Sequence, residues 1–302
     1  MSAGAIAVVG SVAFDTIETP TARADDVLGG SATHFAMSAS YFAPVHLVGV
    51  VGDDFPADAR ALLASRNIDL AGLEVRAGRT FRWTGRYHED MNVRDTLDLQ
   101  LNVFADFQPR LSPAIKQAPF VFLGNIDPRL QEGVLDQFTR PTLVACDTMN
   151  HWIEGARAPL LGLLPRLDLL VLNDEEARLL SGERNVSRAA RWILAQGPKR
   201  VLVKRGEYGA ILFSADAVFA VPAYPLETVF DPTGAGDAFA GGMMGHLAAS
   251  GDQSEPALRR AIVYGTVLAS FVVEDFGSRR LHTVSRDDVE RRYRQFVALT
   301  EF

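Results

Sequence analysis

Short apolar runs alternate with longer segments of helical periodicity over most of this chain. Runs of this kind suit strands that are buried on both faces of a parallel sheet. Because strands that alternate with helices build sheets covered on both sides, the pattern predicts a doubly wound, three-layer α/β/α fold. The predicted strands are residues 5–10, 45–51, 120–123, 142–145, 167–172 and 200–203. The predicted helices are residues 31–42, 56–66, 131–139, 152–164, 187–196, 235–250, 257–273 and 285–299.

One segment breaks this alternation. Residues 80–104 alternate apolar with polar side chains and are rich in β-branched and aromatic residues at both ends. This pattern predicts strands with one exposed face. The segment is interpreted as a small β appendage or lid, and an excursion of the main sheet is the alternative.

Composition narrows the classes of partner. The formal net charge is −7 with charges of both signs scattered along the chain, which argues against nucleic acid or an anionic membrane as the main partner. No apolar run is long enough to span a bilayer, and the first residues lack the basic region of a signal peptide. The single cysteine, Cys146, excludes an internal disulfide, so a cytoplasmic location is expected.

A glycine-rich turn near the C-terminus carries the strongest chemical signal. A strand-like run, residues 226–230, leads through Asp231 into Gly234, Ala235 and Gly236 at the start of a long helix. The first N–H groups of a helix lack intrahelical acceptors and carry partial positive charge, so small residues there let a phosphate approach closely. The carboxylate of Asp237, placed beside this anion pocket, could take the proton of an attacking hydroxyl. Alternatively, Asp237 only decorates the first helical turn, and the small residues that follow permit close helix packing.

The sequence DPTGAGDAFAGG, residues 231–242, resembles the C-terminal signature of the ribokinase-like (PfkB) family of carbohydrate and nucleoside kinases. The resemblance continues in order along nearly the whole chain. The segments that carry it are GSVAFD (10–15), GGSATHFAMSASYF (29–42), residues 48–69, NDEE (173–176), VKRGEYGA (203–210) and VVEDFGS (272–278).

The resemblance implies one ribokinase-like kinase domain over residues 1–302, with a mostly parallel central sheet. Parts of residues 11–28 and 80–104 would form a β lid. It also implies transfer of a phosphoryl group from ATP to a hydroxymethyl group of a sugar, polyol or nucleoside. Asp237 would be the general base, and the backbone of Gly234, Ala235, Gly236 and Asp237 would form the anion hole.

Several residues are candidates for holding the acceptor. Asp15 follows the first strand and could accept hydrogen bonds from two neighbouring hydroxyls, while Gly29 and Gly30 either let the backbone approach the substrate or supply turn dihedrals. His34 stands where the family usually has Asn, and it could bind a hydroxyl or serve as a structural histidine. Two pairs of polar residues follow predicted strands and either line the pocket or cap the next helix: Asn125 with Asp127, and Asp147 with Asn150.

Other residues match the nucleotide side of the family pattern. Asn173 and Glu176 would position hydrated Mg²⁺ and the phosphates, with Glu176 as the metal-side carboxylate, and they also read as a helix N-cap and its N3 acid. Lys204 and Gly206 match nucleotide-contacting positions, and Thr266 aligns with an adenine-side position. The sequence does not decide whether a monovalent cation, K⁺, binds near Asp231.

The sequence lacks the motifs of two other classes of nucleotide-binding enzyme. Phe239 stands where a dinucleotide-binding fingerprint needs its third glycine, and no Gly-Lys-Ser/Thr triplet of a Walker-type NTPase occurs. The remaining alternative is a catalytically inactive sugar- or nucleoside-sensing protein on the same fold. The resemblance also allows a homodimer formed through the lid.

Overall fold

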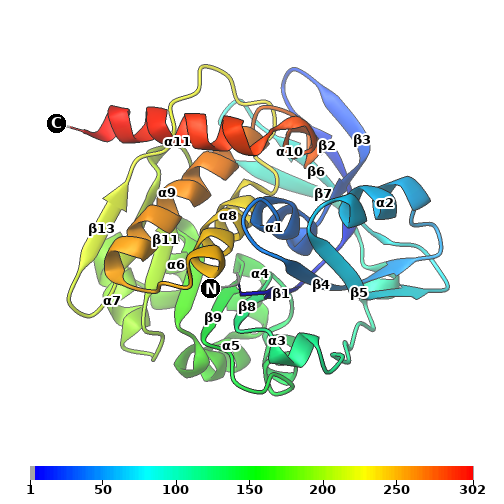
Figure 1. Ribbon diagram of the computed structural model, residues 1–302, viewed down its shortest axis with the longest axis horizontal. Helices are drawn as coiled ribbons and strands as arrows, with labels where there is room; N and C mark the ends of the chain where they lie inside the picture. Colours follow the sequence, from blue (N-terminus) through cyan, green and yellow to red (C-terminus); the bar gives the residue numbers. More distant parts are fainter. Residues whose placement is uncertain (1–3, 302) are drawn as a thin grey trace. The chain divides into compact units, whose positions relative to one another are not determined.

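The computed structural model describes residues 4–301 (Figure 1). The chain divides into two compact units. The first contains the residues up to Pro109 and those from Tyr224 onward, and the second runs from Arg110 to Ala223. Among the described residues, no helix is both long and apolar enough to cross a membrane.

A parallel three-strand arrangement forms the core of the first unit. Its strands are β1 (Ile6–Val9), β4 (Val45–Gly52) and β5 (Ile68–Arg76), with β4 in the middle. The side chains of β1 are completely buried, which explains its continuous apolar sequence. The helices of this unit are α1 (Ser31–Ala39), α2 (Ala57–Ser65), α8 (Ala235–Ser250), α9 (Glu255–Val272), α10 (Arg279–Thr283) and α11 (Arg286–Thr300).

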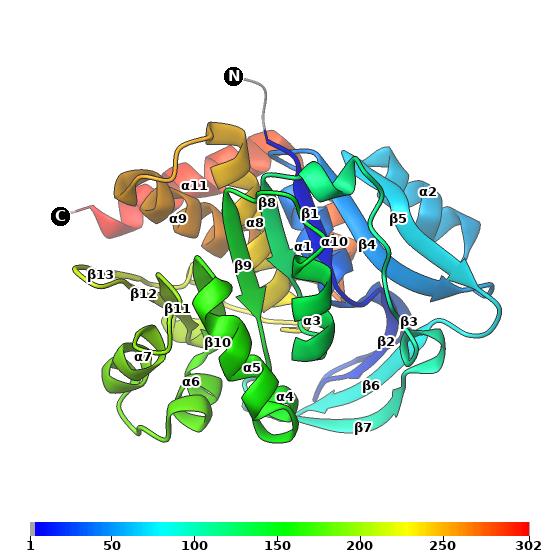
Figure 2. The same ribbon diagram turned by 90° about the horizontal axis from the view of Figure 1, so that it is seen from below.

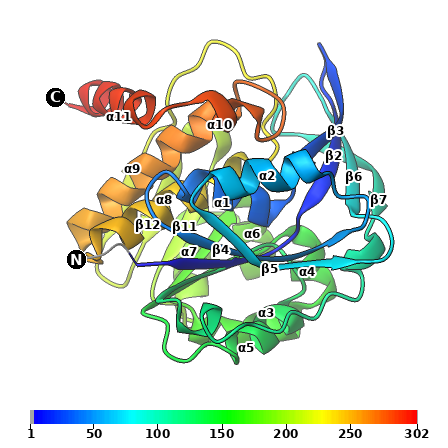
Figure 3. The same cartoon turned by 45° about the vertical axis from the view of Figure 1, so that its right-hand side comes forward.

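Small residues bring three of these helices into close contact. α8 packs against both α1 and α9, as Figures 1 and 3 show. A Cβ at Gly241 would lie 2.2 Å from the backbone oxygen of Phe35 on α1, and one at Gly242 would lie 3.1 Å from the backbone oxygen of Tyr264 on α9. The glycines after Asp237 therefore do serve close helix packing, as one of the interpretations from the sequence proposed.

A second, four-stranded sheet belongs to the same unit and is called here the small sheet. Its order is β3 (Arg23–Gly29), β2 (Ala13–Glu18), β6 (Phe81–Tyr87) and β7 (Arg94–Gln100). β2 and β6 are parallel, and the two outer pairs are antiparallel. The strands predicted within residues 80–104 are present, but β7, an edge strand of this sheet, is exposed on both faces rather than one.

The second unit contains a mixed sheet, seen in Figure 2. Four parallel strands stand in the order β11 (Val201–Lys204), β10 (Leu169–Asn173), β9 (Leu143–Asp147) and β8 (Phe120–Leu123). The antiparallel strands β12 (Ala210–Phe213) and β13 (Val218–Val221) continue the sheet beyond β11. Its helices are α3 (Pro128–Leu135), α4 (Asn150–Gly155), α5 (Arg157–Leu163), α6 (Asp174–Ser181) and α7 (Val186–Leu194).

Three sequence predictions of secondary structure differ from the structure. Residues 226–230 form no strand, and the N–H of Phe230 donates instead to the backbone oxygen of Val273, at 2.8 Å. The helix predicted over residues 152–164 is broken at Ala156, whose φ of −137° and ψ of 36° end α4 and begin α5. α3 also starts earlier than predicted, because Asp127 caps it and Pro128 occupies its first turn.

Candidate active site

The glycine turn, residues 231–237, is anchored by a buried carboxylate. Asp231 has no exposed surface, and its two oxygens accept hydrogen bonds from two backbone N–H groups. One donor is Thr233, at 2.8 Å, and the other is Gly277 in the segment after α9, also at 2.8 Å. Burial raises the pKa of the Asp231 carboxyl. Asp231 therefore fastens the beginning of the turn to the segment that follows α9.

Gly234 begins α8 in a conformation that requires glycine. It is the N-cap residue, with φ 75° and ψ −1°, and no side chain caps this helix end. The N–H of Ala235 donates to the backbone oxygen of Pro232 at 3.2 Å. Asp237 lies in the first helical turn, where the partial positive charge of the helix favours the ionised carboxylate.

Asp15 on β2 is buried in an acidic neighbourhood of the same unit. Its side chain occupies the space beside Gly29, where a Cβ would lie 1.9 Å from Asp15 Oδ2. Burial, followed by the charges of Asp231 and Asp237, raises the pKa of Asp15 to about 7, although a hydrogen bond from the Gly30 N–H opposes the shift. Asp15 and Asp237, the proposed acceptor ligand and the proposed base, are thus close enough to influence each other electrostatically.

Contacts within the protein explain why residues 29 and 30 are glycines. Gly29 leaves room for the Asp15 carboxylate, while Gly30 caps α1 with φ 90° and ψ 150°. A Cβ on Gly30 would stand 2.5 Å from the backbone oxygen of Ser11. Of the two interpretations made from the sequence, the one that assigns turn dihedrals ahead of a helix accounts for Gly30.

His34 is a buried polar side chain with unused hydrogen-bonding capacity. It is 1% exposed, and neither Nδ1 nor Nε2 has a hydrogen-bond partner among the described residues. Burial, together with the nearby His282, lowers the pKa of His34 to about 4, so the ring is neutral near pH 7. A neutral imidazole carries one donor and one acceptor, which suits a hydroxyl ligand.

Two further residues of this unit were not found from the sequence. The hydroxyl of Tyr87, at the end of β6, is 3.0 Å from Thr233 Oγ1 in the glycine turn. Burial raises the pKa values of both Asp15 and Tyr87, and the positive charge of Arg94 on β7 opposes this rise. Both residues lie in the alternating segment 80–104, where the pattern predicts strands but says nothing of contacts with residues far away in the chain.

In the second unit, three of the candidate residues end adjacent parallel strands. Asp147 ends β9, Asn173 ends β10 and Lys204 ends β11, and the register pairs Asn173 directly with Lys204. Lys204 Nζ lies 3.1 Å from Asp147 Oδ2, and the N–H of Thr148 donates to Asp147 Oδ1 at 2.9 Å. Because Asp147 is buried, this ion pair compensates its charge within the protein.

Asn173 and Glu176 form a complete capping box at the start of α6. Glu176 N–H donates to Asn173 Oδ1 at 2.8 Å, and Asn173 N–H donates to Glu176 Oε2 at 2.7 Å. The structural role foreseen for this pair is therefore confirmed. Among the residues that the structure describes, no group of three or more His, Cys, Asp or Glu side chains could hold a metal ion. A Mg²⁺ that keeps most of its waters and contacts phosphates fits a site with one carboxylate, such as Glu176.

The remaining candidates of the second unit mostly serve local structure. Asp127 caps α3 by accepting from the N–H of Arg129 at 2.9 Å. Asn125 Oδ1 accepts from Trp152 Nε1 at 3.0 Å. Asn150 is exposed, and its Oδ1 accepts from the N–H of His151 at 2.9 Å. Gly206 has φ 53° and follows β11.

Thr266 lies in α9 of the first unit. It is buried, and its hydroxyl donates to the backbone oxygen of Ile262 at 3.1 Å. Its hydrogen-bonding capacity is thus partly used by its own helix.

Residues 5–283 match the family model of the pfkB family carbohydrate kinases. The chain belongs to this family. The chain is 31% identical over 245 residues to a cytidine kinase of Thermococcus kodakarensis. The aligned region covers 79% of this chain and 87% of that protein. It is 28% identical over 292 residues to a nucleoside kinase of Methanothermobacter thermautotrophicus, covering 90% of each protein.

Solved structures agree on the fold. A putative ribokinase II of E. coli in complex with ATP and Mg²⁺ superposes with a TM-score of 0.79 at 21% identity, covering 98% of this chain and 99% of that one. A nucleoside kinase of Burkholderia thailandensis in complex with inosine superposes with a TM-score of 0.76 at 18% identity, covering 97% of this chain and 98% of that one. The predicted ribokinase-like three-layer fold is thereby confirmed, and so is the predicted class of enzyme, a phosphotransferase with an alcohol group as acceptor.

Proposed function

We propose that this kinase transfers the γ-phosphoryl group of ATP to a hydroxymethyl group of a nucleoside, with sugars and polyols as the competing acceptor classes. Two relatives that are similar over most of the chain are a cytidine kinase and a nucleoside kinase, which favours the nucleoside. The observation that carries the chemistry is the start of α8. There the N-cap residue Gly234 leaves the helix end without a side-chain cap, and Asp237 lies in the first turn.

Asp237 is the general base of the proposed reaction. It takes the proton of the acceptor hydroxyl while that oxygen forms a bond to the γ-phosphorus. The bond from the γ-phosphorus to the bridging oxygen breaks, and ADP leaves with the electron pair. The N–H groups at the start of α8, from Gly234 to Asp237, stabilise the charge on the transferred group.

Asp15 orients the acceptor. In its ionised form the carboxylate accepts hydrogen bonds from two neighbouring hydroxyls, an arrangement that a ribose diol provides. Gly29 keeps the space in which this carboxylate lies. The neutral ring of His34, which has no partner among the described residues, is assigned to the same acceptor pocket.

On the nucleotide side, we assign Mg²⁺ and the phosphates to Asn173 and Glu176, and nucleotide contacts to Lys204, Gly206 and Thr266. Mg²⁺ neutralises charge on the phosphates when it is bound. The capping box holds the Glu176 carboxylate in a fixed orientation beside the Asn173 N–H. The Lys204 side chain is held in place by its ion pair with Asp147.

We further propose that the small sheet acts as a lid that excludes water from the reaction, within one kinase domain, and that it pairs in a homodimer. β7 is an edge strand whose Leu97 and Leu99 are 45% and 54% exposed. An edge strand with exposed apolar residues is a surface suited to pairing. Light scattering should show a dimer for the native chain and a monomer for Leu97→Lys/Leu99→Lys. A native chain that is monomeric at assay concentrations would remove the dimer.

The single cysteine is buried, and its pKa is raised well above the usual range by burial. A chain whose thiol forms no disulfide suits a reducing compartment, and we propose the cytoplasm.

The function is tested by measuring ADP release from Mg·ATP with a panel of nucleosides, pentoses, hexoses and inositols, in K⁺ and in Na⁺ buffers. We expect one class of nucleosides to stimulate release strongly and mass spectrometry to find a nucleoside monophosphate. A sugar or polyol phosphate as product would move the acceptor to that class. Nucleoside binding without ADP release from any acceptor would instead identify a sensing protein.

A further inference from the structure

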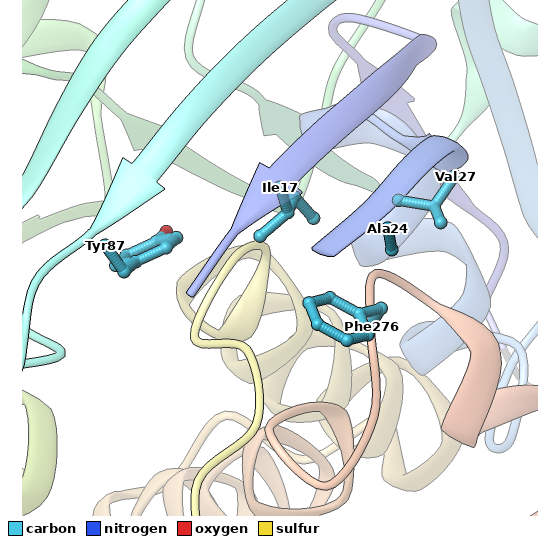
Figure 4. Close-up of a cluster of buried hydrophobic side chains, with 5 residues drawn as sticks. All are labelled: Ile17, Ala24, Val27, Tyr87 and Phe276. Atoms are coloured by element: carbon cyan, nitrogen blue, oxygen red, sulfur yellow. The ribbon is translucent and has the colours of Figure 1, made fainter. Parts of the chain in front are cut away.

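The small sheet is packed onto the segment that follows α9. Figure 4 shows a cluster of five buried apolar side chains that joins the two. Ile17 comes from β2, Ala24 and Val27 from β3, and Tyr87 from the end of β6, while Phe276 reaches in from the segment after α9. None of the five is more than 8% exposed. Three strands of the small sheet therefore share one apolar anchor outside the sheet.

The same segment is bonded to the glycine turn. Gly277, the neighbour of Phe276, donates its N–H to Asp231 Oδ2, and Asp231 Oδ1 accepts from the Thr233 N–H. Gly277 itself has φ 58°, so its backbone is held in a conformation that favours glycine. A movement of Phe276 would be transmitted through two short hydrogen bonds to the start of the turn.

A second and direct connection runs through the Tyr87 hydroxyl. It lies 3.0 Å from Thr233 Oγ1, one residue before Gly234. The ring of Tyr87 is held by the cluster, and the residue is 4% exposed, so the hydroxyl has little freedom to leave. Burial raises the pKa of Tyr87 further above its ordinary value, so the hydroxyl keeps its proton at neutral pH.

The strand that carries Tyr87 also pairs with the strand that carries Asp15. β2 and β6 run parallel, with Asp15 opposite Trp83 and Ile17 opposite Gly85. A ligand held by Asp15 is therefore bound to the strand that pairs with β6, which ends in Tyr87. The path from the acceptor site to the glycine turn consists of one strand pair and one side-chain hydrogen bond.

We propose that Tyr87 is a positioning residue that sets the geometry of the glycine turn through Thr233, so that the small sheet controls the anion hole and the placement of Asp237. This proposal rests on the proposed function of the turn. Small misplacements of groups that hold a transferring phosphoryl can cost orders of magnitude in rate, so one hydrogen bond at this point has a large effect on turnover.

The test removes the hydroxyl while keeping the ring. Tyr87→Phe preserves the apolar cluster but also removes the bond between the Tyr87 hydroxyl and Arg94. Thr233→Val removes Oγ1 and its bond to Asp231 while keeping the backbone N–H that bonds Asp231. We expect each variant to lower kcat about tenfold, with KM for the acceptor within about twofold of the native value. Thr233→Ser, which restores the hydroxyl, should recover most of kcat.

A double-mutant cycle separates coupling from independent effects. If the two hydroxyls act through each other, Tyr87→Phe/Thr233→Val is slower than the slower single variant by much less than the product of the two single effects. Tyr224→Phe is the matched control, because it removes a comparable hydrogen bond, from Tyr224 to Gln295 Oε1 at 3.0 Å, that does not involve the turn. Fully additive losses in the double variant, or a native kcat in Tyr87→Phe, would overturn the proposal.

A second measurement does not depend on turnover. Hydrogen exchange of the backbone amides of residues 231–238 should be faster in Tyr87→Phe and in Thr233→Val than in the native chain or in Tyr224→Phe. If the native chain phosphorylates no acceptor, the proposed function fails, while faster exchange still supports the coupling. Native exchange in both variants contradicts the coupling, even in an active kinase.

Discussion

The ring of His34 occupies the position where a side chain on Gly234 would stand. A Cβ at Gly234 would lie 2.3 Å from Cγ of the His34 ring, far inside van der Waals contact. His34 belongs to α1 and Gly234 to the start of α8, so the contact joins α1 to the glycine turn. The backbone of the turn can approach α1 this closely only because residue 234 has no side chain.

Gly234→Ala should therefore damage both stability and turnover. Its φ of 75° disfavours alanine, and the added Cβ would collide with His34. We expect the free energy of unfolding to fall by about 1–3 kcal/mol and kcat to fall at least about 100-fold. Gly251→Ala is the control, because Gly251 ends the same helix at φ 65°, and no atom of residues outside its immediate chain surroundings lies within 4 Å of its Cβ position. Similar kcat losses in the two variants would argue against the contact.

Asp237→Asn should abolish most of the turnover and leave ATP binding intact. Loss of a general base typically costs about 10²- to 10⁴-fold in rate, whereas the amide keeps nearly the same shape. ADP release and calorimetric titration with ATP measure the two effects separately. Asp287→Asn, an exposed residue in the first turn of α11, controls for loss of a carboxylate at a helix start. Near-native turnover of Asp237→Asn would remove the assignment of the base.

The stability of the protein should depend on pH through Asp15. The pKa of Asp15 in the folded chain is raised to about 7, chiefly by burial, from 3.8. A raised pKa means that the folded state binds the proton more tightly than the unfolded state does. The contribution of Asp15 to the free energy of unfolding is therefore full below about pH 4 and is lost as pH rises through about 7. The difference amounts to roughly 4 kcal/mol at most.

The comparison of the native chain with Asp15→Asn isolates this effect. The free energy of unfolding of the native chain, relative to the variant, should fall between about pH 4 and pH 7. Acceptor binding by the native chain should improve over the upper part of that range, since the ionised carboxylate is the better acceptor of hydrogen bonds. A pH-independent difference between the two proteins would show that Asp15 keeps an ordinary pKa.

Glu176→Gln should separate the structural role of this residue from its proposed metal role. Glutamine can still accept from the Asn173 N–H, so the capping box and the free energy of unfolding should change little. The lost charge should raise the Mg²⁺ concentration needed for half-maximal turnover several-fold. Glu176→Ala should add a stability loss of about 1 kcal/mol. An unchanged Mg²⁺ requirement in Glu176→Gln would confine Glu176 to capping.

Lys204→Met should destabilise the protein by leaving the buried Asp147 without its partner. Removal of one member of a buried ion pair costs about 3–5 kcal/mol. The double variant Lys204→Met/Asp147→Asn should recover much of that loss, since no charge is then left buried. Urea unfolding measures both. No recovery in the double variant would show that Lys204 stabilises the unit through its other contacts.

The sequence was sufficient to predict those parts of the structure that depend on neighbouring residues along the chain. Residues 120–123 were predicted as a strand and form β8, and residues 235–250 were predicted as a helix and form α8. The Asn173–Glu176 cap followed from residues three positions apart. Apolar periodicity and capping act over a few residues, so they can be read from the sequence alone.

The site was predictable only as far as its motifs reach. The glycine turn and its helix were recognised from consecutive residues, while Tyr87 was missed because its partner Thr233 is 146 positions away. Residues 226–230 have the apolar, β-branched character of a strand but find no strand to pair with. The Phe230 N–H is satisfied by the end of α9 instead.

Sequence alone determined the alternation of strands and helices, the family and the glycine turn, because each is encoded in contiguous residues. Tertiary structure decided the environment of the charged groups. Only the packed chain buries Asp15 near Asp231 and Asp237, joins Lys204 to Asp147, and presses His34 against Gly234. Desolvation and close contact depend on distances through space, and those distances are set by the folding of segments that lie far apart in the chain.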